Sequence, residues 1–169
     1  MSSIAFVHAD RSTEMTEPMA SPAELTTDQM VILRRTGKQP LRFRGRQVLE
    51  ATGHSTEGRI WHEINIWHKI KGDCFVVDLR VFKKAPGEKD IFHAESFSSM
   101  AEAVAYLESF DPKQDINVNI DTDSQVLTTA ELTLKAVALR QQLEEAERLY
   151  QTLLGDLLYQ IETSNSLHD

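Results

Sequence analysis

"RIWHEINIWHKIKGDCFVVDLRVFKK", residues 59–84, contains two runs in which apolar and polar side chains alternate. A period of two predicts β-strands that each have one buried face. Lys71, Gly72 and Asp73 separate the two runs, and Gly72 can adopt the positive φ that a tight hairpin requires. This stretch therefore predicts an antiparallel hairpin at the centre of the fold.

The segments that flank the hairpin extend it into a sheet with a covering helix. Residues 41–53 alternate in the same way, and residues 91–97 predict a fourth, shorter strand. Ser99 and Glu102 then form a capping box, after which the period becomes helical. The apolar stripe of this helix consists of Ala103, Val104, Leu107 and Phe110. We therefore expect an α+β domain over residues 41–111, with a four-stranded antiparallel meander sheet covered by a helix.

The segments outside this domain differ from it in composition and periodicity. Ser21 and Pro22 are typical of a helix start, and Glu24 completes a capping box. Residues 116–120, INVNI, alternate and predict a short additional strand. We expect a disordered tail over residues 1–20, a short helix over 21–36, an acidic linker over 112–127 and a second disordered tail over 163–169.

A long helix is predicted over residues 128–162, which contain no proline. Thr128 and Glu131 form a capping box at its start. Apolar residues then recur four and three positions apart, as in a coiled coil: Leu132, Ala136, Leu139, Leu143, Ala146, Tyr150, Leu153 and Leu157. This seam predicts an oligomerisation helix and a homo-oligomer. The alternative is a helix that folds back on the sheet of its own chain.

The net charge of -8 is unevenly distributed. Residues 34–90 hold 13 Lys and Arg against 7 Asp and Glu, and the rest of the chain holds 5 against 19. A basic block between acidic flanks indicates a polyanion as partner. Shielding of the block by the acidic flanks accounts for the same distribution.

Composition also bears on the compartment. Cys74 is the single cysteine, so an intrachain disulfide is excluded and a reducing, cytoplasmic location is expected. No apolar run has the roughly 20 residues of a membrane span, and the first residues lack the pattern of a signal peptide. We therefore expect no membrane partner.

The polar faces of the predicted strands combine arginine, lysine, amide groups and aromatic rings. In a meander such faces lie side by side. Arg and Lys bind phosphates, while Trp and Phe rings stack on unpaired bases, whose faces a duplex hides. The expected binding residues are Arg42, Arg44, Arg46, Trp61, Asn65, Trp67, Lys69, Arg80 and Phe82. They predict an interface for single-stranded nucleic acid.

The same face is also consistent with two other roles. A protein partner would fit it, because Trp and Arg are enriched at interface hot spots. Packing under the C-terminal helix would instead bury the tryptophans and pair the arginines with glutamates of that helix. The chain could also be an adaptor or inhibitor whose acidic helix occupies the basic surface of a partner protein.

Four antiparallel strands followed by a covering helix, with the basic hairpin KIKGDCFVVDLRVFKK at residues 69–84, form an arrangement similar to the PC4 and whirly families. The resemblance covers residues 41–111. It implies a domain that dimerises and binds unpaired DNA across its sheet. It identifies no individual binding residue in this chain.

Signatures of catalysis are absent from the sequence. It contains no P-loop, no GxGxxG and no GxSxG motif. His62, His68, Cys74 and His93 lack the spacing of a standard metal site. The carboxylates of Glu63 and Asp78, on facing strands, are better explained by salt links to nearby basic residues. We therefore expect a non-enzyme without metal or cofactor.

Overall fold

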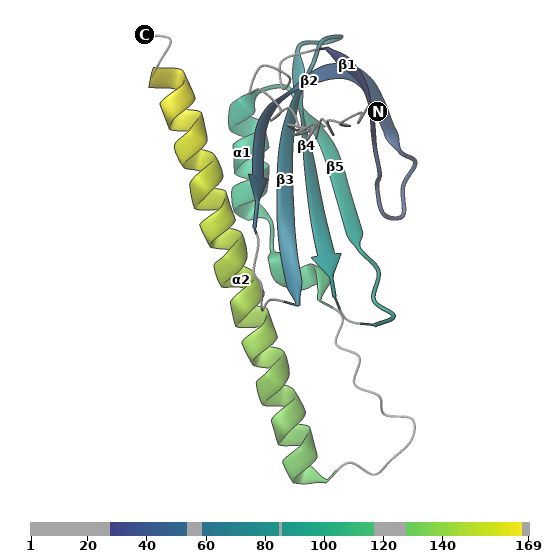
Figure 1. The fold of residues 1–169 in the computed structure, drawn as a ribbon, viewed down its shortest axis with the longest axis vertical. Coiled ribbons are helices and arrows are strands. Elements are labelled where there is room, and N and C mark those ends of the chain that lie inside the picture. Colours follow the sequence, from purple (N-terminus) through teal and green to yellow (C-terminus); the bar gives the residue numbers. More distant parts are fainter. Residues whose placement is uncertain (1–27, 54–58, 85, 117–127, 167–169) are drawn as a thin grey trace, which may run out of the picture.

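The computed structural model describes residues 28–53, 59–84, 86–116 and 128–166, which form a curled antiparallel sheet and a long C-terminal helix (Figure 1). The strands, in chain order and in sheet order alike, are β1 (Gln29–Leu33), β2 (Leu41–Thr52), β3 (Ile60–Lys69), β4 (Cys74–Lys83) and β5 (Ile91–Phe97). The helices are α1 (Met100–Ser109), the short 3-10 helix η2 (Pro112–Asp115) and α2 (Thr129–Ser166). The α+β class is confirmed, with five strands in place of the four predicted.

The strand β1 corrects the prediction of a helix over residues 21–36. Residues 29–33 pair with β2, from Gln29 opposite Gly45 to Leu33 opposite Leu41. Their side chains alternate between exposed and buried, which is the pattern of a strand with one covered face. The capping signal of the predicted helix, like the tail over residues 1–20, lies outside the described residues.

The central hairpin is confirmed. Its register runs without interruption from Ile60 opposite Lys83 to Lys69 opposite Cys74. Gly72 in the turn has a φ of 97°, the left-handed conformation for which glycine is suited. Four aliphatic side chains on one face of the hairpin are fully buried: Ile64, Ile66, Val77 and Leu79.

A β-bulge in β2 divides that strand between the two faces of the sheet. The register with β3 shifts between Gln47 and Leu49, so that Val48 is the additional residue. Leu49 therefore joins the face covered by the helices, whereas Phe43 lies on the other face against Trp67. We call these the helix-covered face and the tryptophan face. Residues 29–46, which form β1 and the first half of β2, are called the arm.

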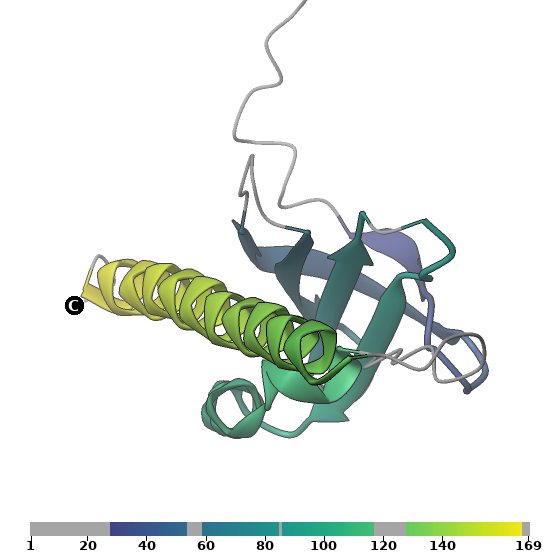
Figure 2. The same cartoon turned by 90° about the horizontal axis from the view of Figure 1, so that it is seen from below.

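Both helices lie on the same side of the sheet (Figure 2). α1 begins at the predicted cap, where the N–H of Glu102 donates to Ser99 Oγ at 3.2 Å. The C-terminal part of α2 packs beside it, and the Tyr150 hydroxyl donates to the carbonyl of Leu107 at 2.7 Å. The two helices thus share one core with β2, β3 and β4.

The predicted seam of α2 is divided between buried and exposed positions. Ala146, Tyr150, Leu153 and Leu157 are buried in the core of their own chain, as in the fold-back alternative. The first turns extend beyond the sheet (Figure 1), and we call residues 129–140 the overhang. In the overhang Leu132, Leu134 and Val137 are 47%, 70% and 50% exposed. Of the predicted seam, only the N-terminal part, which includes Leu132, is therefore left exposed by its own chain.

The boundaries of α2 are close to those predicted. Thr128 caps the helix, since the N–H of Glu131 donates to Thr128 Oγ1 at 3.3 Å. At the other end the helix continues to Ser166, past the predicted end at residue 162. No helix of the described residues is long and apolar enough to span a membrane. The predicted strand at residues 116–120 lies almost wholly outside the described residues.

Candidate nucleic-acid interface

The tryptophan face presents its most accessible rings at the start of β3. Trp61 and Phe82 are direct cross-strand partners, and their ring centroids are 5.2 Å apart with planes 17° from parallel. Phe92 on β5 meets the edge of Phe82 at 6.4 Å. All three side chains are half-buried, and the helices pack on the opposite face. We call Trp61, Phe82 and Phe92 the aromatic stack.

Two cations lie over the aromatic stack. The ammonium of Lys84 is 5.5 Å from the centroid of the Trp61 ring, and the guanidinium carbon of Arg34 is 4.4 Å from that of Phe92. Cation–π contacts at such exposed positions contribute about 0.5–1 kcal/mol each. They hold positive charge beside ring faces, which is the pairing that a nucleotide needs for its phosphate and its base.

An open hollow of about 990 Å³ adjoins the stack. It lies between the turn that follows β1 and the connection between β4 and β5, and Phe92 forms part of its wall. Its charged residues are Arg34, Arg35, Glu88, Lys89 and Asp90. The hollow therefore extends the basic surroundings of the stack toward the chain segment after β1.

A polar network occupies the middle of the tryptophan face. Arg80 donates to Asp78 Oδ2 from Nε at 2.9 Å, and its Nη1 is 3.8 Å from Glu63 Oε2. Burial raises the pKa of Asp78. The positive charge of Arg80 and the hydrogen bonds of Asp78 with Arg80 and Asn65 oppose this shift. Arg80 is thus engaged by two carboxylates of its own chain. The predicted salt links of Glu63 and of Asp78 to a nearby basic residue are both formed with this arginine.

Trp67 and Asn65 are part of the interior. Trp67 is 8% exposed and packs edge-on against Phe43, with ring centroids 6.4 Å apart. Asn65 is 7% exposed and accepts from Gln47 Nε2 at 2.8 Å. The two tryptophans do share a face, as the alternation predicts, but the arm covers only Trp67. Internal packing therefore accounts for one tryptophan and leaves the other accessible.

The structure separates the three predicted arginines of β2 from the tryptophans. Arg46 pairs with His68 on the helix-covered face, whereas Gln47 pairs with Trp67 on the other. Arg42 and Arg44 alternate with Phe43 and so point outward from the arm, as Arg46 does. The expectation of one continuous face is wrong here, because the bulge at Val48 shifts the alternation of β2. Lys69 remains on the tryptophan face, partly exposed, opposite Gly45.

Three residues of the site were not among those predicted from the sequence. Phe92 belongs to the site because the register between β4 and β5 places it opposite Arg80. Arg34 was missed because its segment was expected to be helical. Lys84 directly follows β4, where the alternation of the strand no longer indicates the face of the sheet on which a side chain lies.

The helix-covered face holds the histidines considered as metal ligands. His62 is 1% exposed and packs edge-on against Tyr150 at 5.2 Å. His93 Nε2 is 2.8 Å from Asp115 Oδ2, and His68 Nε2 is 2.6 Å from Asp73 Oδ1. Within the described residues no three His, Cys, Asp or Glu side chains are grouped as a metal site.

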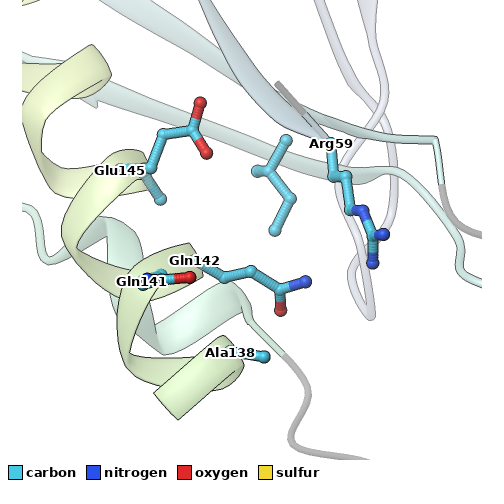
Figure 3. A pocket seen from close by; sticks show the side chains of 7 residues that line it. Arg59, Ala138, Gln141, Gln142 and Glu145 are labelled. Atoms are coloured by element: carbon cyan, nitrogen blue, oxygen red, sulfur yellow. The ribbon is translucent and has the colours of Figure 1, made fainter. Parts of the chain in front are cut away.

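A smaller hollow of about 260 Å³ lies where α2 leaves the sheet (Figure 3). Arg59 lies on its β3 side, and Gln142 and Glu145 lie on the helix side. Its remaining lining is Ile60, Ala138, Gln141 and Ala146. Among the described residues, the lining contains no Ser, Cys or His that could act as a nucleophile or base. We interpret this hollow as a gap in packing rather than a site.

Comparison with protein-family models, with curated proteins and with solved structures finds no match to this chain. Its function is therefore inferred from the geometry of the chain itself.

Proposed function

We propose that this chain is a non-catalytic protein that binds single-stranded nucleic acid on its aromatic stack. The observation that carries the proposal is the near-parallel pair of Trp61 and Phe82 on the face without helices, with Lys84 over the indole. Ring faces that bear cations match the base and phosphate of a nucleotide.

Unpaired nucleic acid fits this arrangement better than a duplex does. Base–aromatic stacking contributes about 1–3 kcal/mol per base and needs an exposed base face. The stack comprises three rings from three adjacent strands, so it can hold only a short segment. Arg34 and Lys84 beside the rings, and Lys89 in the adjoining hollow, supply contacts with the flanking phosphates.

The resemblance to the PC4 and whirly families supports the same proposal. The order β2, β3, β4, β5 and α1 provides the four antiparallel strands and following helix on which the resemblance rests. β1 and the long α2 have no counterpart in it. The resemblance bears on the candidate binding site only through the basic hairpin that β3 and β4 form.

Titration with single-stranded oligonucleotides, followed by tryptophan fluorescence, tests the proposal. We expect quenching, because Trp61 would stack on a base while Trp67 remains buried. The logarithm of the affinity should fall with the logarithm of salt concentration, with a slope of about -0.7 for each phosphate contact. A Trp67→Phe variant should retain the full quenching amplitude. Unchanged fluorescence at low salt would contradict the proposal, and equal affinity for a duplex would contradict the preference for single strands.

We further propose that the protein self-associates through the overhang. Leu132, Leu134 and Val137 are exposed on a helix segment that extends past its own sheet. Leu134 and Val137 are three positions apart and share one side of the helix, and exposed aliphatic residues at this spacing commonly form helix–helix contacts. The proposed partner is the same overhang of a second copy.

Sedimentation velocity over a range of protein concentrations tests this assembly. A Leu134→Glu/Val137→Glu variant should sediment as a monomer under conditions in which the wild type associates, because each glutamate would be buried in the contact. A Tyr159→Glu variant is the matched control, since Tyr159 is 68% exposed on the same helix outside the overhang. A wild type that stays monomeric at all concentrations, or a double variant that associates unchanged, would rule out this contact.

A further inference from the structure

We propose that the outer edge of β1 is a docking site for an extended acidic peptide of a protein partner, which adds to the sheet as a further strand. This proposal is independent of the aromatic stack, because it uses the arm and the opposite face of the sheet. It rests on three observations made on the described residues: a sheet edge that none of them covers, exposed aliphatic residues beside that edge, and arginine side chains that none of them pairs with.

The two edges of the sheet differ in how they are protected. At the β5 edge, Thr36 N–H donates to the carbonyl of Phe92 at 2.8 Å, and Phe92 N–H donates to Thr36 Oγ1 at 2.9 Å. Glu95 on the same strand forms ion pairs with Arg35 at 3.0 Å and Lys38 at 2.6 Å. Charges and covering segments of this kind keep other chains from pairing with an edge. The β5 edge is thus occupied.

The β1 edge has no comparable protection. β1 is the terminal strand of the sheet, and no strand of the described residues pairs with its outer side. Its sequence QMVIL contains no charged residue, proline or glycine, and its register with β2 has no bulge. Such an edge presents free backbone donors and acceptors to an incoming strand.

Aliphatic side chains lie beside this edge on the outer face of the arm. Met30 is 71% exposed and Ile32 is 58% exposed. Their direct cross-strand partners on β2 are Arg44 and Arg42. These two aliphatic side chains lie opposite guanidinium groups and are too exposed to belong to the core of their own chain. They form a mixed apolar and basic surface next to free backbone groups, as interfaces for strand addition require.

The arginines define the charge of the partner. In the part of the chain that the structure describes, the side chains of Arg42, Arg44 and Arg46 are exposed and take part in no hydrogen bond or ion pair. An anionic partner would gain charge-assisted hydrogen bonds from them. A peptide fits better than a nucleic acid, because only a peptide can pair with the backbone edge of β1, and aliphatic residues do not stack on bases. A second copy paired at β1 would bring two sets of arginines together, so like charges disfavour it.

The geometry of an added strand specifies the peptide further. Adjacent strands lie about 4.8 Å apart, so outward side chains of the added strand would be about 10 Å from the backbone of β2. The long side chains of Arg42 and Arg44 can extend over β1 toward acidic residues there. The inward side chains would continue the apolar cluster that contains Val31 and Leu33. The peptide should therefore alternate acidic and aliphatic residues.

Fluorescence anisotropy with a labelled, acetylated peptide in which aspartate alternates with valine tests the proposal. The wild-type protein should bind it, and an Arg42→Glu/Arg44→Glu variant should lose affinity by about tenfold or more, the equivalent of 1.4 kcal/mol. An Ile32→Lys variant should also lose binding, because it places a positive charge directly at the edge and removes an aliphatic contact. Arg148→Glu, which changes an exposed arginine of α2, is the control and should bind as the wild type does. Circular dichroism confirms that each variant is folded.

Modified peptides distinguish strand addition from other binding modes. The same peptide methylated on alternate backbone nitrogens keeps its charge but cannot pair with β1, so it should not bind. Equal binding of the methylated peptide, or of a peptide with lysine in place of aspartate, would overturn the proposal. So would the absence of peptide binding, or a β1-dependent dimer that Ile32→Lys abolishes. Loss of oligonucleotide binding in the Arg42→Glu/Arg44→Glu variant, with the peptide unbound, would instead assign the arm to the nucleic-acid site.

Discussion

A Trp61→Ala variant is expected to bind single-stranded oligonucleotides about 5- to 150-fold more weakly than the wild type. The indole supplies the most extensive ring of the aromatic stack, and loss of one stacked base corresponds to about 1–3 kcal/mol. Removal of the ring also leaves Lys84 without its cation–π partner and exposes one face of Phe82. Anisotropy of a labelled oligonucleotide is the suitable measurement, because the variant lacks the fluorescent side chain that reports binding.

The second tryptophan provides the matched control. Trp67→Phe removes an indole of the same size, but from a position only 8% exposed, where it packs against Phe43. This variant should lower the unfolding midpoint and leave oligonucleotide affinity unchanged. If Trp61→Ala binds within twofold of the wild type, or if the two variants lose affinity equally, the aromatic stack is not the binding site.

Much of the fold can be predicted from periodicity in the sequence. The alternation of residues 59–84 predicts the two strands and the hairpin of β3 and β4, and the capping residues Ser99 and Thr128 mark the starts of both helices. β1 was missed because a run of four apolar residues, MVIL at 30–33, cannot be distinguished from part of a helix by its period alone. Its strand conformation depends on pairing with β2, which is a tertiary interaction.

The candidate site could be predicted only in part, for a reason that lies in β2. Val48 and Leu49 are adjacent apolar residues, and they interrupt the alternation at the position of the bulge. That single additional residue transfers Arg42, Arg44 and Arg46 to the opposite face from the tryptophans. The curl of the arm, which buries Trp67 and leaves Trp61 accessible, arises from the packing of Phe43 and is not encoded in the period.

His62 makes the stability of the fold sensitive to acid. Its ring is 1% exposed between the sheet and the C-terminal helix, and neither ring nitrogen has a hydrogen-bond partner among the described residues. Burial lowers the pKa of His62 to about 4 from its ordinary value of 6.5; the negative charge of Asp115 opposes this shift and His93 adds to it. Protonation would place an unpaired charge against Tyr150 and Phe110, which pack on the ring edge-on.

The free energy of unfolding should therefore decrease as the pH falls from about 6.5 to about 4. In this window the unfolded chain binds a proton at His62 and the folded chain does not, so acidification favours unfolding. The stabilisation is complete above pH 6.5 and is lost toward pH 4, with a total of about 3 kcal/mol at 1.36 kcal/mol per pKa unit. Urea unfolding at a series of pH values measures the free energy of unfolding. Over this pH window it should decrease by about 3 kcal/mol less in a His62→Leu variant than in the wild type.

Carboxylates also change the pH dependence of stability, so the difference between the two proteins is the informative quantity. Asp78 has a raised pKa and acts in the opposite direction, since its protonation on acidification favours the folded state. Glu95 has a lowered pKa and adds to the loss of stability at low pH. Both contributions are common to the wild type and His62→Leu and cancel in the difference. Parallel curves for the wild type and His62→Leu would mean that the ring is hydrated or paired in solution, and that the core beneath α2 is more open than its packing indicates.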